Sequence, residues 1–158
     1  MVSKSKIITL LILFAFPLIG LCENHIIINK ENFTLYLLED ADTIASYPVC
    51  LGENLGQKTR TGDHKTPEGT FKITQIQNSS SWNHTDKHGV FHKGAYGPWF
   101  FRLSTPMSKH IGIHGTDQPE SVGTRASEGC IRLRNEDLRK LKPYVFKGMK
   151  VVITPDRK

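Results

Sequence analysis

A histidine and a cysteine on either side of a polar loop are the residues of this sequence best suited to chemistry. His114 closes a short apolar run, and Cys130 directly follows Gly129 after a segment rich in glycine and polar residues. A thiol nucleophile needs a nearby base, because a free cysteine is mostly protonated at neutral pH. A glycine before the nucleophile lets the main chain turn tightly enough to aim N–H donors at an oxyanion. The pair therefore predicts covalent catalysis by a cysteine with a histidine base.

Three sequence segments, two of which contain the histidine and the cysteine, strengthen this interpretation. Residues 62–71 read GDHKTPEGTF, residues 97–100 read GPWF ahead of IGIH at 111–114, and residues 127–133 read SEGCIRL. Together they resemble the signature of the L,D-transpeptidase catalytic domain (YkuD-like) family, over roughly residues 25 to 154. The resemblance implies a mostly β fold, an L,D-transpeptidase-like β-sandwich with a short helix near the C-terminus. It also implies a peptidoglycan L,D-transpeptidase that forms a thioester acyl-enzyme on a stem peptide and uses no cofactor or metal.

The resemblance also implies roles for the residues around the pair. Gly115 stands where some relatives have a serine that orients the histidine, so its backbone carbonyl is expected to accept the imidazole N–H. The N–H groups of Gly129 and Cys130 are expected to stabilise the oxyanion, while Ser127 holds the loop. Arg132 would share the open side with the cysteine and meet carboxylates of wall peptides. Three ring-bearing residues are expected to line the substrate groove: His92, Tyr96 and Trp99.

Glu128 is the main departure from the family pattern, since many relatives have a second histidine there. A carboxylate cannot donate as an imidazolium does, and its charge beside a thiolate would raise the pKa of the cysteine. We expect either an effect of Glu128 on rate and reaction type, or a side chain that points away and leaves the oxyanion to main-chain N–H groups.

Three alternatives to crosslinking remain open. Hydrolysis through the same acyl-enzyme would make a carboxypeptidase or an enzyme that detaches wall-linked proteins, because water and an amine compete at one site. A catalytically inactive wall-binding module is the second alternative, and Glu128 supports it. The third is a zinc protein, because His84, His88 and His92 recur at the spacing of metal ligands on a helix. Gly89 disfavours that helix, and a solvated loop is the favoured interpretation.

The N-terminal segment has the pattern of a secretory signal. The chain of 158 residues is long enough for one domain. Lys4 and Lys6 precede an apolar run over residues 7–21. We therefore assign residues 1–22 to a signal peptide and residues 23–158 to the catalytic domain, exported to the periplasm or cell envelope.

Cys22 leaves two ways of processing this signal. Cleavage after Cys22 follows the small residues Gly20 and Cys22 and makes Glu23 the new N-terminus. The alternative is a lipoprotein signal, in which an acylated Cys22 anchors the chain to the membrane, although a bulky Leu21 departs from that pattern.

The charge is moderately basic. Loss of two lysines with the signal reduces 21 basic residues to 19 against 15 acidic ones, a net charge of +4. This favours a polyanionic surface such as a cell wall, and no Lys/Arg stripe interleaved with aromatics suggests nucleic acid. Peptidoglycan stem peptides are the expected partner. The protein is expected to be a monomer. Export allows a Cys50–Cys130 disulfide, but Cys50 ends an apolar run and is favoured as a small buried strand residue.

Local patterns predict the elements that position the pair. Strands are predicted from β-branched and aromatic runs at residues 25–29, 34–38, 43–50, 69–76, 99–104, 110–114 and 150–154. The first strands are joined by turns short enough for an antiparallel meander. Residues 52–69 predict a loop and residues 78–97 a long irregular insertion. Residues 135–142 predict a helix with Asn135 as its N-cap.

Overall fold

The computed structural model describes residues 23–106 and 108–156. The predicted signal at residues 1–22, with Cys22, lies outside the described residues. Within the described ranges, no helix has the length and apolar character needed to cross a membrane.

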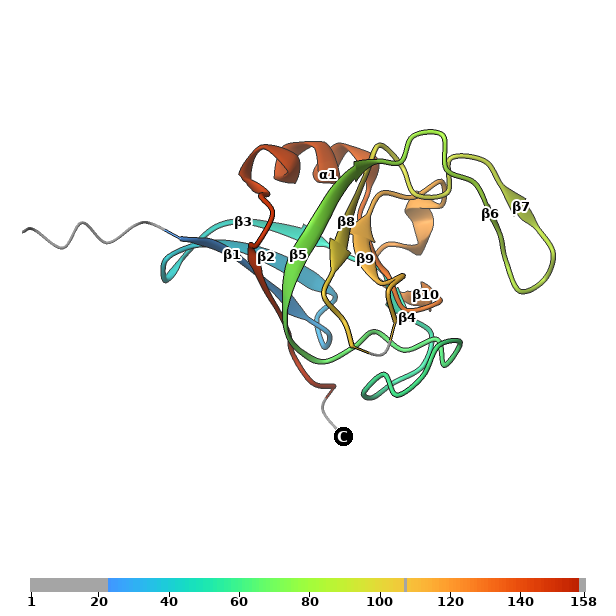
Figure 1. Cartoon of the computed structure of the whole chain (residues 1–158), viewed down its shortest axis with the longest axis horizontal. Coiled ribbons are helices and arrows are strands. Elements are labelled where there is room, and N and C mark those ends of the chain that lie inside the picture. The colour runs from blue at the N-terminus through green and yellow to red at the C-terminus, as the bar shows by residue number, and fades with distance from the viewer. Residues whose placement is uncertain (1–22, 107, 157–158) are drawn as a thin grey trace, which may run out of the picture.

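A curled eight-stranded sheet forms the body of the protein (Figure 1), with strand order β11-β9-β8-β5-β12-β1-β2-β3. In that order the strands are Ile131–Arg132, Gly112–His114, Trp99–Leu103, Gly69–Asn78, Lys150–Ile153, Asn24–Asn29, Thr34–Glu39 and Asp42–Pro48. The chain leaving β3 meets the opposite end of the sheet, where Cys50 and Arg132 exchange backbone hydrogen bonds of 2.8 and 3.0 Å. The sheet therefore curls around one core, and the predicted mostly β fold is confirmed.

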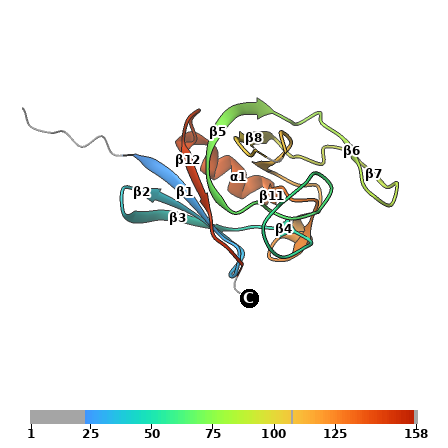
Figure 2. The same ribbon diagram turned by 60° about the horizontal axis from the view of Figure 1, so that its bottom comes forward.

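Two small ladders and three short helices complete the fold. Strand β4 (Leu51–Gly52) pairs with β10 (Arg125–Ser127), and β6 (His84–Thr85) pairs with β7 (Phe91–His92). The helices are η1 (Pro119–Ser121), α1 (Asn135–Leu141) and η2 (Lys142–Tyr144). Figure 2 and Figure 1 both show the β6–β7 hairpin standing out from the body, at the end opposite to β1, β2 and β3.

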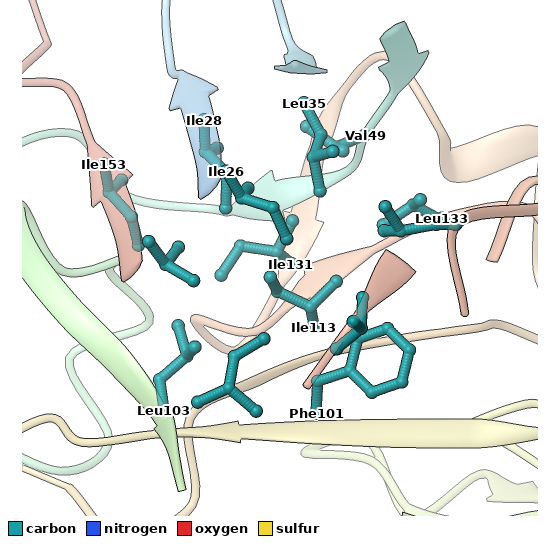
Figure 3. Packing of buried hydrophobic residues seen from close by; sticks show 14 of the residues in the cluster. Ile26, Ile28, Leu35, Val49, Phe101, Leu103, Ile113, Ile131, Leu133 and Ile153 are labelled. Atoms are coloured by element: carbon teal, nitrogen blue, oxygen red, sulfur yellow. The ribbon is translucent and has the colours of Figure 1, made fainter. Parts of the chain in front are cut away.

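The core is built from side chains that alternate along the strands. Ile26 and Ile28 on β1 are fully buried, while their neighbours in the strand are less so, as period-two alternation requires. Figure 3 shows Ile113 of β9 and Ile131 of β11 side by side in the middle of this core. Burial of each such side chain stabilises the fold by about 1.5–3 kcal/mol. Strand β9, which carries His114, and strand β11, which directly follows Cys130, are thus anchored in the core.

The strands predicted from the sequence are all present, whereas five other short strands were not predicted: β4, β6, β7, β10 and β11. Strands β4, β10 and β11 have two or three residues each, too few to show a periodic pattern. The predicted irregular insertion contains the β6–β7 hairpin. The prediction of Asn135 as N-cap is wrong by one position: Arg134 occupies the cap and Asn135 is the first residue of α1.

Candidate active site

The pairing of β9 with β11 brings the predicted cysteine and histidine together. The strands are parallel, with Ile131 opposite Ile113 and Arg132 opposite His114. Because the two isoleucines face the core, the residues next to them face the other side of the sheet. There Cys130, His114 and Arg132 line one open cavity of about 220 Å³. The full lining is Lys58, Thr61, Gly62, His84, Ala95, Tyr96, Ser108, His110, Ile111, His114, Glu128, Cys130 and Arg132.

The turn that presents Cys130 is held by Ser127. Its hydroxyl donates to the carbonyl oxygen of Cys130 at 2.6 Å and accepts the N–H of Gly129 at 3.1 Å. Gly129 has φ +125°, and a Cβ atom there would lie 2.7 Å from the carbonyl oxygen of Lys65, so only glycine fits. Ser127 therefore holds the loop, as expected. The N–H of Gly129, expected to face an oxyanion, is instead engaged by Ser127, which leaves the N–H of Cys130 as the remaining donor of the two.

The imidazole of His114 is oriented by a main-chain acceptor. Its Nδ1 lies 2.6 Å from the carbonyl oxygen of Gly115, the contact expected from the sequence. A carbonyl oxygen only accepts, so Nδ1 carries the proton and Nε2 carries the lone pair. The ring stacks on Phe100 with centroids 5.3 Å apart and lies 4.9 Å from the ring of Tyr96. The aromatic rings fix the plane of the imidazole, and the carbonyl fixes its tautomer.

Asn135 secures the backbone next to this histidine. Its Oδ1 accepts the N–H of Thr116 at 3.0 Å. A Cβ atom at residue 115 would lie 2.1 Å from the same oxygen and 3.0 Å from Cα of Gly97. The absence of a side chain at Gly115 is therefore a packing requirement. Sequence reasoning missed this role, because an asparagine at a helix start is typical of a cap.

The thiol of Cys130 is protonated in this arrangement. Its Sγ donates to the carbonyl oxygen of His110 at 3.4 Å. Burial raises the pKa of the thiol, while the N–H of Gly112 and the positive charges of Arg132 and Lys58 offset part of that effect. For the sulfur to act as a nucleophile, the thiol must therefore lose its proton.

The imidazole is neutral as well. Burial, followed by the positive charge of Arg132, lowers the pKa of His114 to about 3. At neutral pH the pair is thus a thiol and a neutral imidazole. In that state Nε2 of His114 can accept a proton.

Glu128 lies in the cavity wall and is paired with a histidine. Its side chain is 43% exposed, and Oε1 lies 3.3 Å from Nε2 of His84 on β6. Of the two alternatives expected for Glu128, a side chain that points away does not agree with the structure, because Glu128 lines the cavity with Cys130. Its charge raises the pKa of the thiol, as expected.

Arg132 presents a guanidinium with unused donor capacity. Its Nη1 donates a hydrogen bond to Oε1 of Gln118 at 3.2 Å. Its Nε is buried and has no hydrogen-bond partner within residues 23–106 and 108–156. A buried donor without a partner costs free energy, and the guanidinium is part of the cavity lining.

The three expected groove residues have different positions. Tyr96 lines the cavity. His92 lies in an adjoining hollow, where Nδ1 is 2.8 Å from Asp117 and Nε2 is 3.5 Å from Asp86. Trp99 is not among the residues that line the cavity: its ring packs against the core and lies 4.9 Å from Nζ of Lys142.

The regularly spaced histidines do not form a metal site in the described residues, and Cys50 does not form a disulfide with Cys130. His84 and His92 are cross-strand partners of the β6–β7 hairpin. Across the part of the chain that the structure describes, no three His, Cys, Asp or Glu side chains are placed to hold a metal ion. Cys50 is fully buried, and both Cys50 and Cys130 are free thiols.

One wall of the cavity was not predicted at all. Lys58, Thr61 and Gly62 come from the loop between β4 and β5. Polar loop residues carry no periodic signal, and only the folded chain brings them to a cysteine about 70 residues away.

A cysteine directly before β11 and a histidine on the adjacent strand β9 line one cavity of a curled β-sheet. The sequence profile of the L,D-transpeptidase catalytic domain matches residues 23–153, and the chain belongs to this family.

Relatives from two Bacillus species agree with this assignment. A Bacillus licheniformis protein assigned as the L,D-transpeptidase YkuD is 33% identical over 131 residues, covering 83% of this chain and 66% of the relative. The Bacillus subtilis protein assigned as YqjB is 30% identical over 144 residues, covering 90% and 76%. The chain thus spans just under two thirds of the length of the YkuD relative.

Solved structures show the same fold. An L,D-transpeptidase from Mycobacterium smegmatis matches with a TM-score of 0.64 and 18% identity, covering 84% of this chain and 59% of that one. Bdellovibrio bacteriovorus Bd1075 matches with a TM-score of 0.60 and 25% identity, covering 84% and 48%.

Proposed function

We propose that this protein is a peptidoglycan L,D-transpeptidase in which Cys130 is the nucleophile and His114 the base. The observation that carries the proposal is the hydrogen bond that fixes the tautomer of the neutral His114 imidazole. With Nδ1–H held by the carbonyl of Gly115 at 2.6 Å, Nε2 is the proton acceptor in the cavity that also contains the thiol.

In the first half-reaction, Sγ of Cys130 attacks the carbonyl carbon of the L-to-D peptide bond after the third stem residue. The thiol proton passes to Nε2 of His114 as the C–S bond forms, because neither group is charged beforehand. The oxyanion accepts a hydrogen bond from the N–H of Cys130. The imidazolium then returns the proton to the leaving nitrogen, the C–N bond breaks, and a thioester remains.

In the second half-reaction, the amine of another stem attacks the thioester. It gives a proton to Nε2 of His114, the C–S bond breaks, and the thiolate takes that proton back. The donor stem is held by Arg132, whose guanidinium matches a carboxylate, and by the ring of Tyr96. No cofactor or metal enters this sequence of steps.

Hydrolysis of the same thioester is the second candidate, and Glu128 favours it. The Glu128 carboxylate lines the cavity with Cys130. In this reaction it accepts a proton from a water molecule whose oxygen attacks the thioester carbon, and the C–S bond breaks. The product would be a free carboxylic acid in place of a crosslink.

The first experiment is mass spectrometry of the protein after incubation with a tetrapeptide stem or a carbapenem. We expect a covalent adduct on Cys130, and the same adduct in Cys50→Ser as the matched control. The released products then distinguish a crosslinked dimer from a shortened stem. Absence of an adduct on reduced Cys130 would favour a wall-binding module without chemistry.

We further propose that the protein acts in the cell envelope. The support is the N-terminal charge and apolar pattern together with the net charge of the remaining chain.

A further inference from the structure

A buried lysine forms part of the wall of the candidate active site. Lys58 lies in the loop between β4 and β5, its side chain is 2% exposed, and it lines the same cavity as Cys130. Burial of an ammonium group costs several kcal/mol unless the charge is paired. Its partner is Asp63, with Nζ and Oδ1 2.6 Å apart.

Asp63 organises the loop around this ammonium group. Its Oδ2 accepts the N–H groups of Thr59 and Arg60 at 2.8 and 3.1 Å, and its Oδ1 accepts the N–H of Lys65 at 3.1 Å. Although burial opposes it, the Lys58 ammonium and the backbone donors hold the pKa of Asp63 well below its ordinary value. Asp63 is thus a permanent carboxylate that fixes where Lys58 points.

Lys58 has more donors than this structure uses. An ammonium group carries three N–H donors, and Asp63 is the acceptor found for Nζ of Lys58 among the described residues. An ion pair needed only for stability has no reason to lie in a reactive cavity. Buried ion pairs can often be replaced by apolar residues without loss of stability.

The charges around the thiol suggest a role for the Lys58 ammonium group beyond stability. Glu128 adds a negative charge at a site where a nucleophile must also become negative. Lys58 and Arg132 are the cations among the cavity residues, and Arg132 also donates to Gln118. Lys58 is therefore the cation whose placement is governed by a dedicated carboxylate.

We propose that Lys58, held by Asp63, is a positioning residue that stabilises the thiolate of Cys130 against the opposing charge of Glu128. The thiol proton still passes to Nε2 of His114, and no bond forms to Lys58. The catalytic meaning of this role rests on the proposed function, whereas its effect on the thiol does not.

The test is the pH profile of alkylation of Cys130 by iodoacetamide, followed by peptide mass spectrometry on the full chain. Lys58→Gln keeps a donor for Asp63 without the charge, and Lys58→Met is a second neutral variant of similar length. We expect a profile displaced to higher pH and, near neutral pH, alkylation about tenfold slower than in the wild type. Lys58→Arg keeps the charge and should restore the wild-type profile.

Lys87→Gln is the matched control, because Lys87 pairs with Glu53 on the surface and is not among the cavity residues. It should alkylate like the wild type. All variants are compared below the lowest melting temperature in the set. A wild-type profile in folded Lys58→Gln or Lys58→Met would overturn the proposal.

Failure of the two proposals can be told apart. Alkylation needs neither a stem peptide nor turnover, so a wild-type protein that forms no acyl-enzyme would refute the proposed function and leave the Lys58 effect measurable. Conversely, normal acyl-enzyme formation with an unchanged alkylation profile would refute only the role of Lys58.

Discussion

The β9–β11 ladder and the β6–β7 hairpin both contribute histidines to the region around Cys130, but they are held in different ways. His114 on β9 is buried, stacked on Phe100 and bonded to a main-chain carbonyl. His84 and His92 on the hairpin are held by carboxylates. The difference shows that the proposed catalytic histidine is placed by the apolar core, whereas the histidines of the β6–β7 hairpin are placed by contacts with carboxylates.

The largest expected effect separates the two regions by activity. Cys130→Ser and His114→Ala should each abolish turnover, a loss of about two to four orders of magnitude for removal of the base, while the fold stays intact. His84→Ala on the hairpin should change kcat by less than about tenfold, since His84 lines the cavity and pairs with Glu128 at a partly exposed position but is not the proposed base. Steady-state kinetics with a tetrapeptide donor measures kcat of each variant. Equal losses of kcat in His84→Ala and His114→Ala would contradict the distinction between the β9–β11 ladder and the β6–β7 hairpin.

An intermediate effect is expected at Gly115, directly after β9. Gly115→Ala places a methyl group against Asn135 and Gly97, which should lower the free energy of unfolding by about 1–3 kcal/mol. Denaturant unfolding measures the change. The double variant Gly115→Ala/Asn135→Ala should lose less than the two single changes together, because they share one clash. Full additivity would show that Asn135 is not the obstacle.

The smallest expected effect is confined to the hairpin. A hydrogen bond to Asp117, with a further contribution from Asp86, raises the pKa of His92 above its ordinary value of 6.5. A raised histidine pKa stabilises the folded state below pH 6.5, and this contribution is lost as pH rises through the folded pKa. Hydrogen exchange of the hairpin amides, corrected for intrinsic rates, should therefore show more opening at about pH 8 than at about pH 6.

His92→Gln is the control for that measurement. It should expose the hairpin at both pH values and remove the difference between them, while the amides of β1 and β2 stay protected throughout. A pH dependence that survives the substitution would assign it to another group of the hairpin.

Sequence reasoning succeeded where periodicity or a local motif carried the information. The long strands alternate visibly, and Ser127, Gly129 and Cys130 form a recognisable turn. It could not decide which neighbouring aromatic faces the site: adjacent strand residues point to opposite faces, and Phe100, not Trp99, stacks on His114. Contacts between distant segments were equally invisible, as for Lys58.

The carbonyl of Gly115 has a consequence for how mutation can reach this site. A serine acceptor could be lost through a single codon change, whereas a peptide carbonyl belongs to every residue and cannot be deleted by substitution. A larger residue at the same position meets Asn135 and Gly97 and destabilises the fold. A change of side chain at residue 115 therefore does not remove the acceptor that fixes the tautomer of His114. Only changes that displace the main chain there affect this tautomer.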